Sequence, residues 1–131
     1  MTDASLLIIM TADTKAWAKD PQSYWQNAPK EVADLLSGWM GPFHEGREWL
    51  QRDEAQRSIG LAMQNIMLAA KAMGYDSCPM IGFDIEKVAE LINLPDDYVM
   101  GPMVAVGKKT KDSWPKPGQL SLRELVIENS F

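Results

Sequence analysis

The feature of the sequence that most constrains the fold is one long stretch, residues 48–74, in which apolar side chains recur at helical spacing on two faces. One stripe consists of Ile59, Ala62, Met63, Ile66, Ala69, Ala70 and Met73, and the opposite side carries Leu61, Leu68 and Ala72. A helix that is apolar on both sides is buried between layers or across a subunit interface. The sequence therefore predicts a long buried helix that begins near Glu48 and ends at Gly74, a residue typical of helix C-termini.

The length and composition fit a single domain of mixed α and β structure. The chain has 131 residues, of which 46% are hydrophobic, and this share is too high for a disordered protein. The formal net charge is −5 and the basic residues are scattered, so nucleic acid is not expected as a partner. The one dense basic run, residues 108–111, is interpreted as a solvated loop.

The sequence offers few residues for a targeting signal, a disulfide or a metal site. The apolar run Leu6–Met10 is too short to span a membrane and no basic segment precedes it, so no membrane partner is expected. Cys78 is the only cysteine and cannot form an internal disulfide, which is typical of the cytoplasm, where we expect the protein to be. Cys78 and the only histidine, His44, are too few ligands for a conventional zinc site. His44 lies in an expected loop, where we favour a packing role over catalysis.

Three stretches of the chain are interpreted as extended. The run Ser5–Thr11 is apolar on both faces, which indicates a central strand covered on both sides. The run Tyr98–Val106 contains Pro102, which indicates an edge position or a bulge, because proline cannot donate to a strand ladder. The third stretch, Leu120–Asn129, has a partly alternating pattern and lies near the end of the chain.

Two shorter helices and a connector complete the prediction. A helix that starts at Pro29 is expected to end at Gly41-Pro42. Asp84 is expected to cap another helix, whose inner side carries Ile85, Val88, Leu91 and Ile92. Residues 76–83 show no periodic pattern and are interpreted as an irregular connector between the long helix and this one. Gly82, inside the connector, has no side chain and would let a second backbone or a flat ligand approach closely.

Several of these segments resemble the nitroreductase family of flavin enzymes. The matching segments are Arg52-Asp53-Glu54-Ala55, the run from Ala62 to Ala70, the run from Met73 to Asp84, and Trp114–Leu120 near the end. The resemblance extends over nearly the whole chain. It implies an α+β fold, a nitroreductase-like sandwich with a central antiparallel-type sheet, in which the long helix is buried at a dimer interface.

The resemblance also implies a binding site for flavin mononucleotide (FMN). In the family the flavin lies between the two subunits of a homodimer, and the C-terminal arm of each subunit crosses onto its partner. The loop that matches Pro79, Met80, Ile81 and Gly82 lies against the isoalloxazine ring, with backbone N–H groups facing its reactive edge. The position that matches Lys116 carries a basic residue near the flavin phosphate. These five residues are therefore implied to bind the cofactor, and no catalytic side chain or metal ligand is implied.

The sequence departs from the family pattern in two places. Many members carry a second basic residue where this chain has Gly118. Members also begin with a helical region whose arginine- and serine-rich motif binds the flavin phosphate, followed by a Pro-Ser-containing segment, and neither occurs here. We therefore expect residues 1–131 to form a single nitroreductase-like domain that is truncated at the N-terminus and corresponds to the C-terminal two-thirds of a member. Residues 112–131 are expected to form its extended C-terminal arm.

Two functions of different classes follow from the resemblance. The first is an FMN-dependent oxidoreductase that uses NAD(P)H to reduce a small-molecule electron acceptor, a nitroaromatic or a quinone, by a ping-pong mechanism. The alternative is a catalytically inactive, flavin-free remnant that acts as a dimeric interaction module. The retained segment Pro79–Gly82 favours the enzyme, whereas the missing phosphate ligands favour the remnant.

Overall fold

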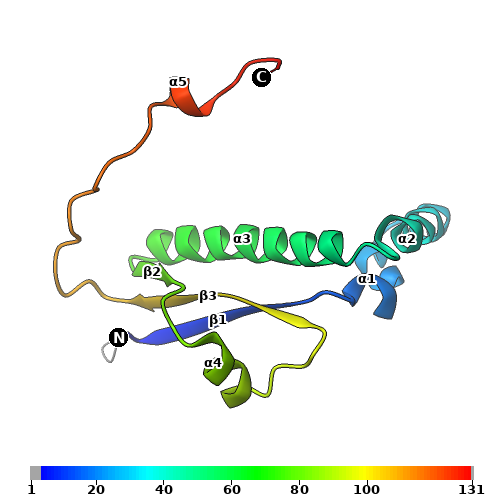
Figure 1. Cartoon of the computed structure of the whole chain (residues 1–131), viewed down its shortest axis with the longest axis horizontal. Coiled ribbons are helices and arrows are strands. Elements are labelled where there is room, and N and C mark those ends of the chain that lie inside the picture. The colour runs from blue at the N-terminus through cyan, green and yellow to red at the C-terminus, as the bar shows by residue number, and fades with distance from the viewer. Residues whose placement is uncertain (1–3, 131) are drawn as a thin grey trace.

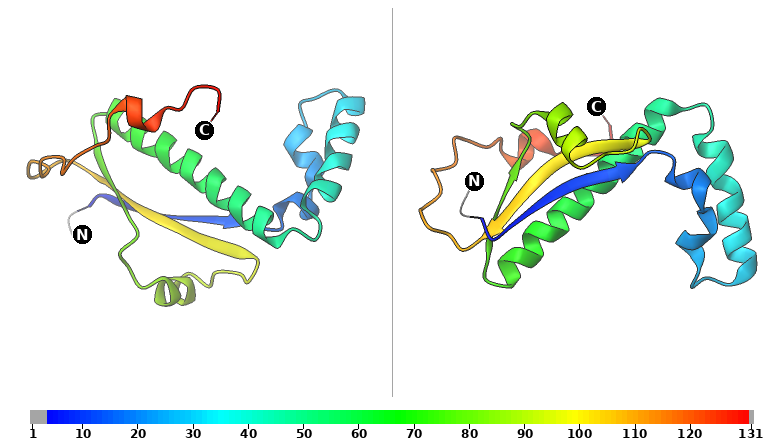
Figure 2. Two further views of the ribbon diagram at one scale, coloured as in Figure 1. Left: turned by 45° about the horizontal axis from the view of Figure 1, so that its top comes forward. Right: turned by 90° about the horizontal axis from the view of Figure 1, so that it is seen from below.

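The computed structural model describes residues 4–130, which form an α+β structure around a three-stranded antiparallel sheet (Figure 1). In chain order the elements are β1 (Leu6–Asp13), α1 (Ala16–Lys19), the 3-10 helix η1 (Pro21–Trp25), α2 (Lys30–His44), α3 (Glu48–Ala72), β2 (Asp76–Met80), α4 (Ile85–Leu91), β3 (Tyr98–Gly107) and α5 (Leu122–Leu125). The helix α3 lies along one face of the sheet and α4 lies on the other side. The elements α1, η1 and α2 form a lobe beyond one end of the sheet (Figure 2).

The strand order is β1-β3-β2, so β3 is the central strand and β1 is an edge strand within the described residues 4–130. The prediction that Ser5–Thr11 forms a central strand is therefore wrong for this sheet. A continuous apolar run indicates that both faces of a strand are covered, but it does not indicate how many neighbouring strands that strand pairs with. The side chains of Leu6 and Leu7, at the start of β1, are 53% and 47% exposed.

Pro102 lies in the central strand and not at an edge, but the predicted bulge is confirmed. Ile9 pairs with Met103 and Thr11 pairs with Met100, so Gly101 and Pro102 together stand opposite one residue of β1. On its other side β3 pairs with β2 only from Met103 onward. The proline thus occupies the irregular position where the missing N–H is tolerated.

The helix α3 has the predicted extent, but only one of its two apolar faces is covered within the chain. Leu50, Ala55, Ile59 and Ala70 are buried against the rest of the molecule. On the other side, the exposed fractions are 71% for Leu61 and 59% for Leu68. The core is therefore a thin layer between α3 and the sheet, centred on Met103 and on Val104, which is fully buried.

Four local predictions need correction. The helix α2 continues through Gly41-Pro42 to His44, because a proline removes only its own N–H and Glu45 still donates to the carbonyl of Gly41 at 2.8 Å. Residues 76–80 form β2, because pairing with a strong central strand overrides a weak local pattern. Residues 122–125 form α5, whose Ser121–Glu124 capping box is visible in the sequence. The helix α4 leaves two of its expected inner residues exposed, Ile85 and Leu91.

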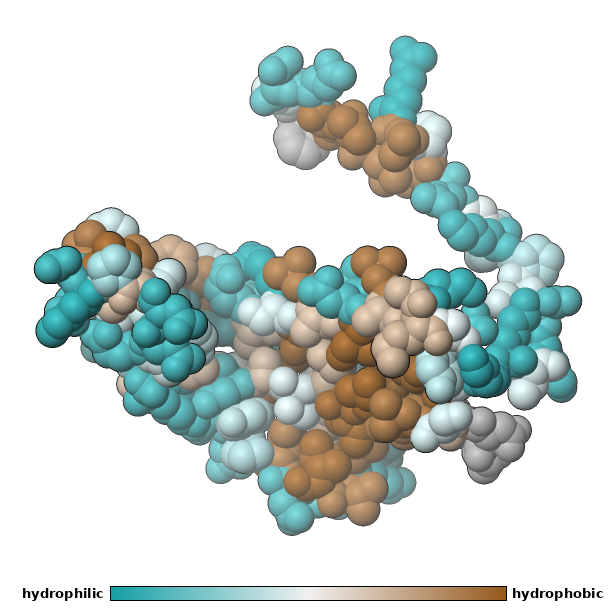
Figure 3. Space-filling model, turned by 180° about the vertical axis from the view of Figure 1, so that it is seen from behind, coloured by the Kyte–Doolittle hydropathy of each residue, from teal (hydrophilic) through white to brown (hydrophobic). Residues whose placement is uncertain are grey.

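The chain leaves the end of β3 as an extended arm that runs on the same side of the sheet as α3 (Figure 1). Its last part carries exposed apolar side chains, Leu120, Leu122, Leu125, Val126 and Ile127. Figure 3 shows this apolar cluster on the arm and a second, broader apolar surface on the body of the molecule. None of the helices in residues 4–130 is long and apolar enough to cross a membrane.

Candidate functional site

The candidate cofactor segment, Pro79–Gly82, lies at the open edge of the sheet. Pro79 and Met80 are the last residues of β2 and pair with Val104 and Met103 of the buried central strand. Ile81 and Gly82 follow beyond the last pair, and the side chain of Ile81 is 73% exposed. The segment is thus backed by the core on one side and open on the other.

The backbone of this segment can receive a flat ligand. A Cβ atom built on Gly82 meets no heavy atom within 4 Å, so the space beside this residue is open. Among residues 4–130, no side chain and no loop carbonyl accepts a hydrogen bond from the Ile81 or Gly82 N–H. Two donors and an unobstructed surface are what a planar heterocycle with acceptor atoms requires. Gly82 is not among the glycines with positive φ. Glycine suits a flat ligand at this position because it has no side chain, and not because the backbone is left-handed.

The C-terminal end of the segment is held by the cap of α4. The Asp84 carboxylate accepts from the Lys87 N–H at 3.1 Å and pairs with the Lys87 ammonium at 3.0 Å. The hydrogen bond from the Lys87 amide, together with that from its side chain, lowers the pKa of Asp84 below its ordinary value. This confirms the predicted cap and fixes the point at which the open segment ends.

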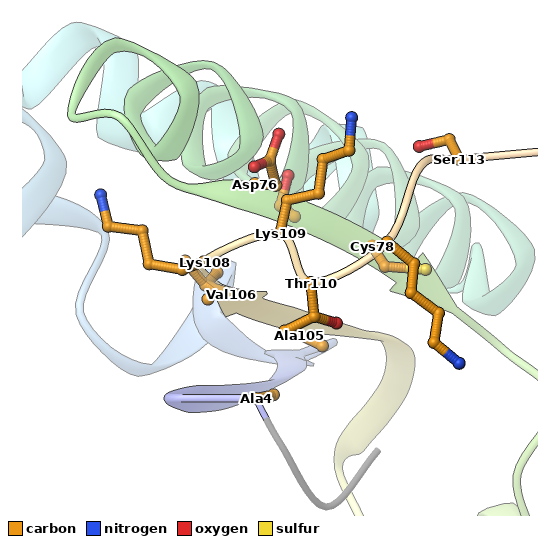
Figure 4. Close-up of a pocket in the computed structure, with 12 residues that line it drawn as sticks. Ala4, Asp76, Cys78, Ala105, Val106, Lys108, Lys109, Thr110 and Ser113 are labelled. Carbon is orange, nitrogen blue, oxygen red and sulfur yellow. The ribbon is translucent and has the colours of Figure 1, made fainter.

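A surface hollow of about 360 Å³ lies at the other end of β2 (Figure 4). It is bordered by Asp76, Ser77 and Cys78 of β2 and by the basic segment 107–111 that follows β3. The basic segment is exposed, as predicted, but it is not simply solvated. Lys108 donates to the carbonyl of Gly74 at 2.7 Å, a contact that no sequence pattern indicated.

Lys116 is not brought next to Pro79–Gly82 within this chain. Its ammonium donates to the side-chain oxygen of Gln119, on the same exposed arm, at 3.1 Å. The arm runs on the α3 side of the sheet, whereas the chain passes from β2 to α4 on the opposite side (Figure 1). The five residues implied to bind FMN therefore form two separate groups in one subunit.

His44 has a packing role, as favoured from the sequence, although it ends helix α2 and does not lie in a loop. Its ring stacks on Trp17 with centroids 5.4 Å apart, and Phe43 approaches it edge-on at 4.9 Å. Its Nδ1 atom lies 2.9 Å from the Met40 carbonyl oxygen. The nearby hollow of about 390 Å³, between the lobe and the start of α3, is bordered by Trp17, His44 and Gln51.

An apolar groove of about 410 Å³ runs between β1 and α3. Leu6 and Ile8 of β1 form one wall, and Ile66 of α3 and Met73, directly after α3, form the other. Within residues 4–130, β1 pairs with one strand only. These features leave apolar surface and strand edge available to a further segment of protein.

The comparisons with known proteins agree on one family. The model of the nitroreductase family matches residues 1–108 of the chain. Protein DrgA of Synechocystis is 63% identical over 131 residues, and the match covers 96% of this chain and 62% of that protein. MhqN of Bacillus subtilis, provisionally named an NAD(P)H nitroreductase, is 41% identical over 86 residues, which cover 64% of this chain and 42% of that protein. The chain thus spans less than two thirds of the length of these relatives.

A solved structure shows the same fold. The crystal structure of a protein from Staphylococcus epidermidis, provisionally named an NAD(P)H:FMN oxidoreductase, superposes with a TM-score of 0.83 at 27% sequence identity. The superposition covers 95% of this chain and 61% of that chain. The three strands and the long helix described above therefore form part of a larger known architecture.

Proposed function

Since this chain belongs to the nitroreductase family, we propose that it acts as an FMN-dependent oxidoreductase that reduces nitroaromatic or quinone-like molecules with NAD(P)H. The observation that carries the proposal is the open segment Pro79–Gly82. It lies within the family match, and its free N–H groups and bare Gly82 suit a flat ring. The names of the Staphylococcus epidermidis and Bacillus subtilis relatives support FMN as the cofactor and NAD(P)H as the reductant.

In this proposal the protein binds and orients the cofactor. The amides of Ile81 and Gly82 would donate to the edge of the ring, with the side chain of Ile81 exposed beside them. Lys116 would contribute a positive charge to the phosphate. The chemistry supplied by bound FMN is hydride transfer in a ping-pong cycle, from NAD(P)H first and to the small-molecule acceptor second. No side chain of this chain is assigned as a general acid or base.

We further propose that the active form is a homodimer built on α3. The uncovered face of this helix, with Leu61 and Leu68, offers an apolar surface that a second copy would bury. The apolar end of the arm, residues 120–127, would cross onto the partner. Such a crossing would also allow Lys116 of one subunit to approach a site from which it is remote in its own chain.

The second candidate is a flavin-free dimeric interaction module. It is favoured by the position of Lys116, whose ammonium is bonded to Gln119 on the exposed arm, and by Gly118, which supplies no charge. In this case the uncovered face of α3 would form the dimer interface, and the segment Pro79–Gly82 would bind no cofactor.

A titration of the purified chain with FMN separates the two candidates. We expect flavin fluorescence to be quenched as FMN binds, and we expect the loaded protein to oxidise NADH or NADPH when a nitroaromatic or a quinone is added. Binding should be weaker than in a family member with a basic residue at the position of Gly118, because a missing charge-assisted contact to phosphate costs about 1.5–3 kcal/mol. A dimer that does not quench FMN at millimolar protein excess would establish the interaction module instead.

A further inference from the structure

Lys108 makes contacts that join three elements at the corner where α3 passes into β2. Its ammonium donates to the Gly74 carbonyl oxygen at 2.7 Å and lies 4.3 Å from the centroid of the Tyr75 ring. Lys108 itself follows directly after β3. A lysine that bonds a carbonyl at a helix C-terminus also interacts favourably with the helix dipole, and its position over the ring adds a cation–π contact.

The corner itself is a tight turn that permits few conformations. Gly74 has φ of +77°, and the Tyr75 N–H donates to the Ala70 carbonyl at 2.8 Å. This closes α3 and leads the chain into β2 after the three connecting residues 73–75. A contact that fixes Gly74 and Tyr75 therefore fixes where β2 begins.

The neighbouring lysines bind groups other than Gly74 and Tyr75. Lys109 pairs with Asp112 at 2.7 Å, and Lys71 pairs with Asp76 at 3.0 Å. Figure 4 shows the side chains of Lys108 and Lys109 pointing in different directions from the end of β3. In the described part of the chain, Lys108 is thus the lysine that connects β3 to the corner.

The strand β2 depends on its ends for its position. Within the described residues 4–130 it pairs with β3 alone, over five residue pairs from Asp76 to Met80, and Pro79 cannot donate to the ladder. Its far end runs into Ile81 and Gly82, and the cap at Asp84 holds the segment from the other side. A short edge strand of this kind opens locally at low free energy when one end is released.

We propose that Lys108 is a positioning residue for the cofactor segment: by its contacts with Gly74 and Tyr75 it holds the start of β2, and thereby the amides of Ile81 and Gly82, in place. This inference deepens the proposed function and rests on it. Lys108 does not touch the ligand in this proposal. Its effect on flavin binding is exerted through the strand.

The test compares Lys108→Met with Lys111→Met, which lies on the same exposed segment. Amide hydrogen exchange is measured over residues 76–82 and over β1, and FMN affinity and thermal melting are measured on the same samples. We expect Lys108→Met to speed exchange of the paired β2 amides, those of Ser77, Cys78 and Met80, by about two- to fivefold and to weaken FMN binding similarly, which is the range of exposed charged contacts. Lys111→Met should match the wild type in all three measurements.

Two further variants exclude a merely structural effect. Lys108→Arg retains a donor and a cation over the ring and should restore both exchange and affinity, whereas Tyr75→Leu removes the ring and should shift exchange in the same residues. Unchanged exchange over residues 76–80 in Lys108→Met would overturn the inference, and so would a rise of the same size in β1. If the wild type itself binds no FMN, the proposed function fails, and the exchange data alone then decide whether Lys108 positions β2.

Discussion

Gly101 and Ile59 are in such close contact that no side chain fits between them. A Cβ atom on Gly101 would lie 2.6 Å from Ile59 Cγ2 and 3.3 Å from the Met10 carbonyl oxygen. Gly101 belongs to the bulge of the central strand, and Ile59 is a buried residue in the middle of α3. The absence of a side chain at position 101 thus sets how closely the long helix approaches the sheet.

The first prediction follows from this contact. Gly101→Ala should lower the free energy of unfolding by about 1–3 kcal/mol, because the added methyl group overpacks the core. In an Ile59→Ala background, which is itself destabilised by about 2–5 kcal/mol, the added cost of Gly101→Ala should largely disappear. Urea denaturation of the four proteins measures both costs. Equal costs in the two backgrounds would show that Ile59 is not the obstacle.

Gly82→Val should abolish FMN binding without loss of fold stability. The space beside Gly82 is open and its backbone is not left-handed, so a valine fits the free protein, and the change in unfolding free energy should stay within about 0.5 kcal/mol. The same side chain would occupy the space proposed for the flavin ring. Thermal melting and flavin retention are measured together, with Gly38→Val, at another glycine with open surroundings, as the control. A folded Gly82→Val protein that keeps its flavin would remove this residue from the site.

Lys116→Met should weaken FMN binding by about tenfold to a hundredfold, the range for a charge-assisted contact to phosphate. Its effect should be smaller for riboflavin, which lacks the phosphate group. Lys30→Met, in the lobe, serves as the control, since Lys30 pairs with Asp34 far from the arm in sequence. Equal losses for FMN and riboflavin would contradict a role for Lys116 at the phosphate.

The uncovered face of α3 predicts a dimer that a single charge can disrupt. Leu68→Glu should shift the protein from dimer to monomer at micromolar concentration, because an unpaired carboxylate is costly to bury in an apolar interface. Leu91→Glu, at the exposed end of α4, should leave the assembly unchanged. Light scattering coupled to gel filtration gives both results. A wild-type monomer would contradict the homodimer. A Leu68→Glu protein that remains a dimer would show that the interface lies away from this face of α3.

Asp13 should make the protein sensitive to acid. Burial would raise the pKa of this carboxyl, but hydrogen bonds from the Lys19 ammonium and the Lys15 amide, with the charge of Lys19, hold it below the ordinary 3.8. Since the folded-state pKa is the lower one, the stabilisation is fully present above the unfolded-state pKa and is lost as pH falls through the folded-state pKa. Urea midpoints between pH 6 and pH 2 should fall less steeply for Asp13→Asn than for the wild type, and parallel curves would contradict the assignment.

Lys19 gives the complementary effect at high pH. Hydrogen bonds from this ammonium to Asp13 and Asp97 raise its pKa above the ordinary 10.5. Its contribution is therefore fully present below the unfolded-state pKa and is lost as pH rises through the folded-state pKa. The pair Lys19–Asp13 joins α1 to the end of β1, so this loss should loosen the lobe first.

The sequence by itself determined the elements whose signals are local. The extent of α3, the cap at Asp84 and the bulge at Pro102 were all predictable, because helical periodicity, a capping side chain and a missing N–H act within a few residues. The resemblance to the nitroreductases, now confirmed by the family match, was carried by the run from Met73 to Asp84. The roles of Pro79–Gly82 and Lys116 remain predictions.

Only the tertiary structure decided which elements are neighbours. The segment of β2 has no periodic sequence pattern, and it forms a strand because it pairs with β3. In the strand order β1-β3-β2 the central place belongs to β3, so β1 lies at an edge. The contact of Lys108 with Gly74 joins residues 34 positions apart, and that of Gly101 with Ile59 joins two distant elements. Such contacts arise when the whole chain packs, because their free energy depends on distances that a linear pattern does not encode.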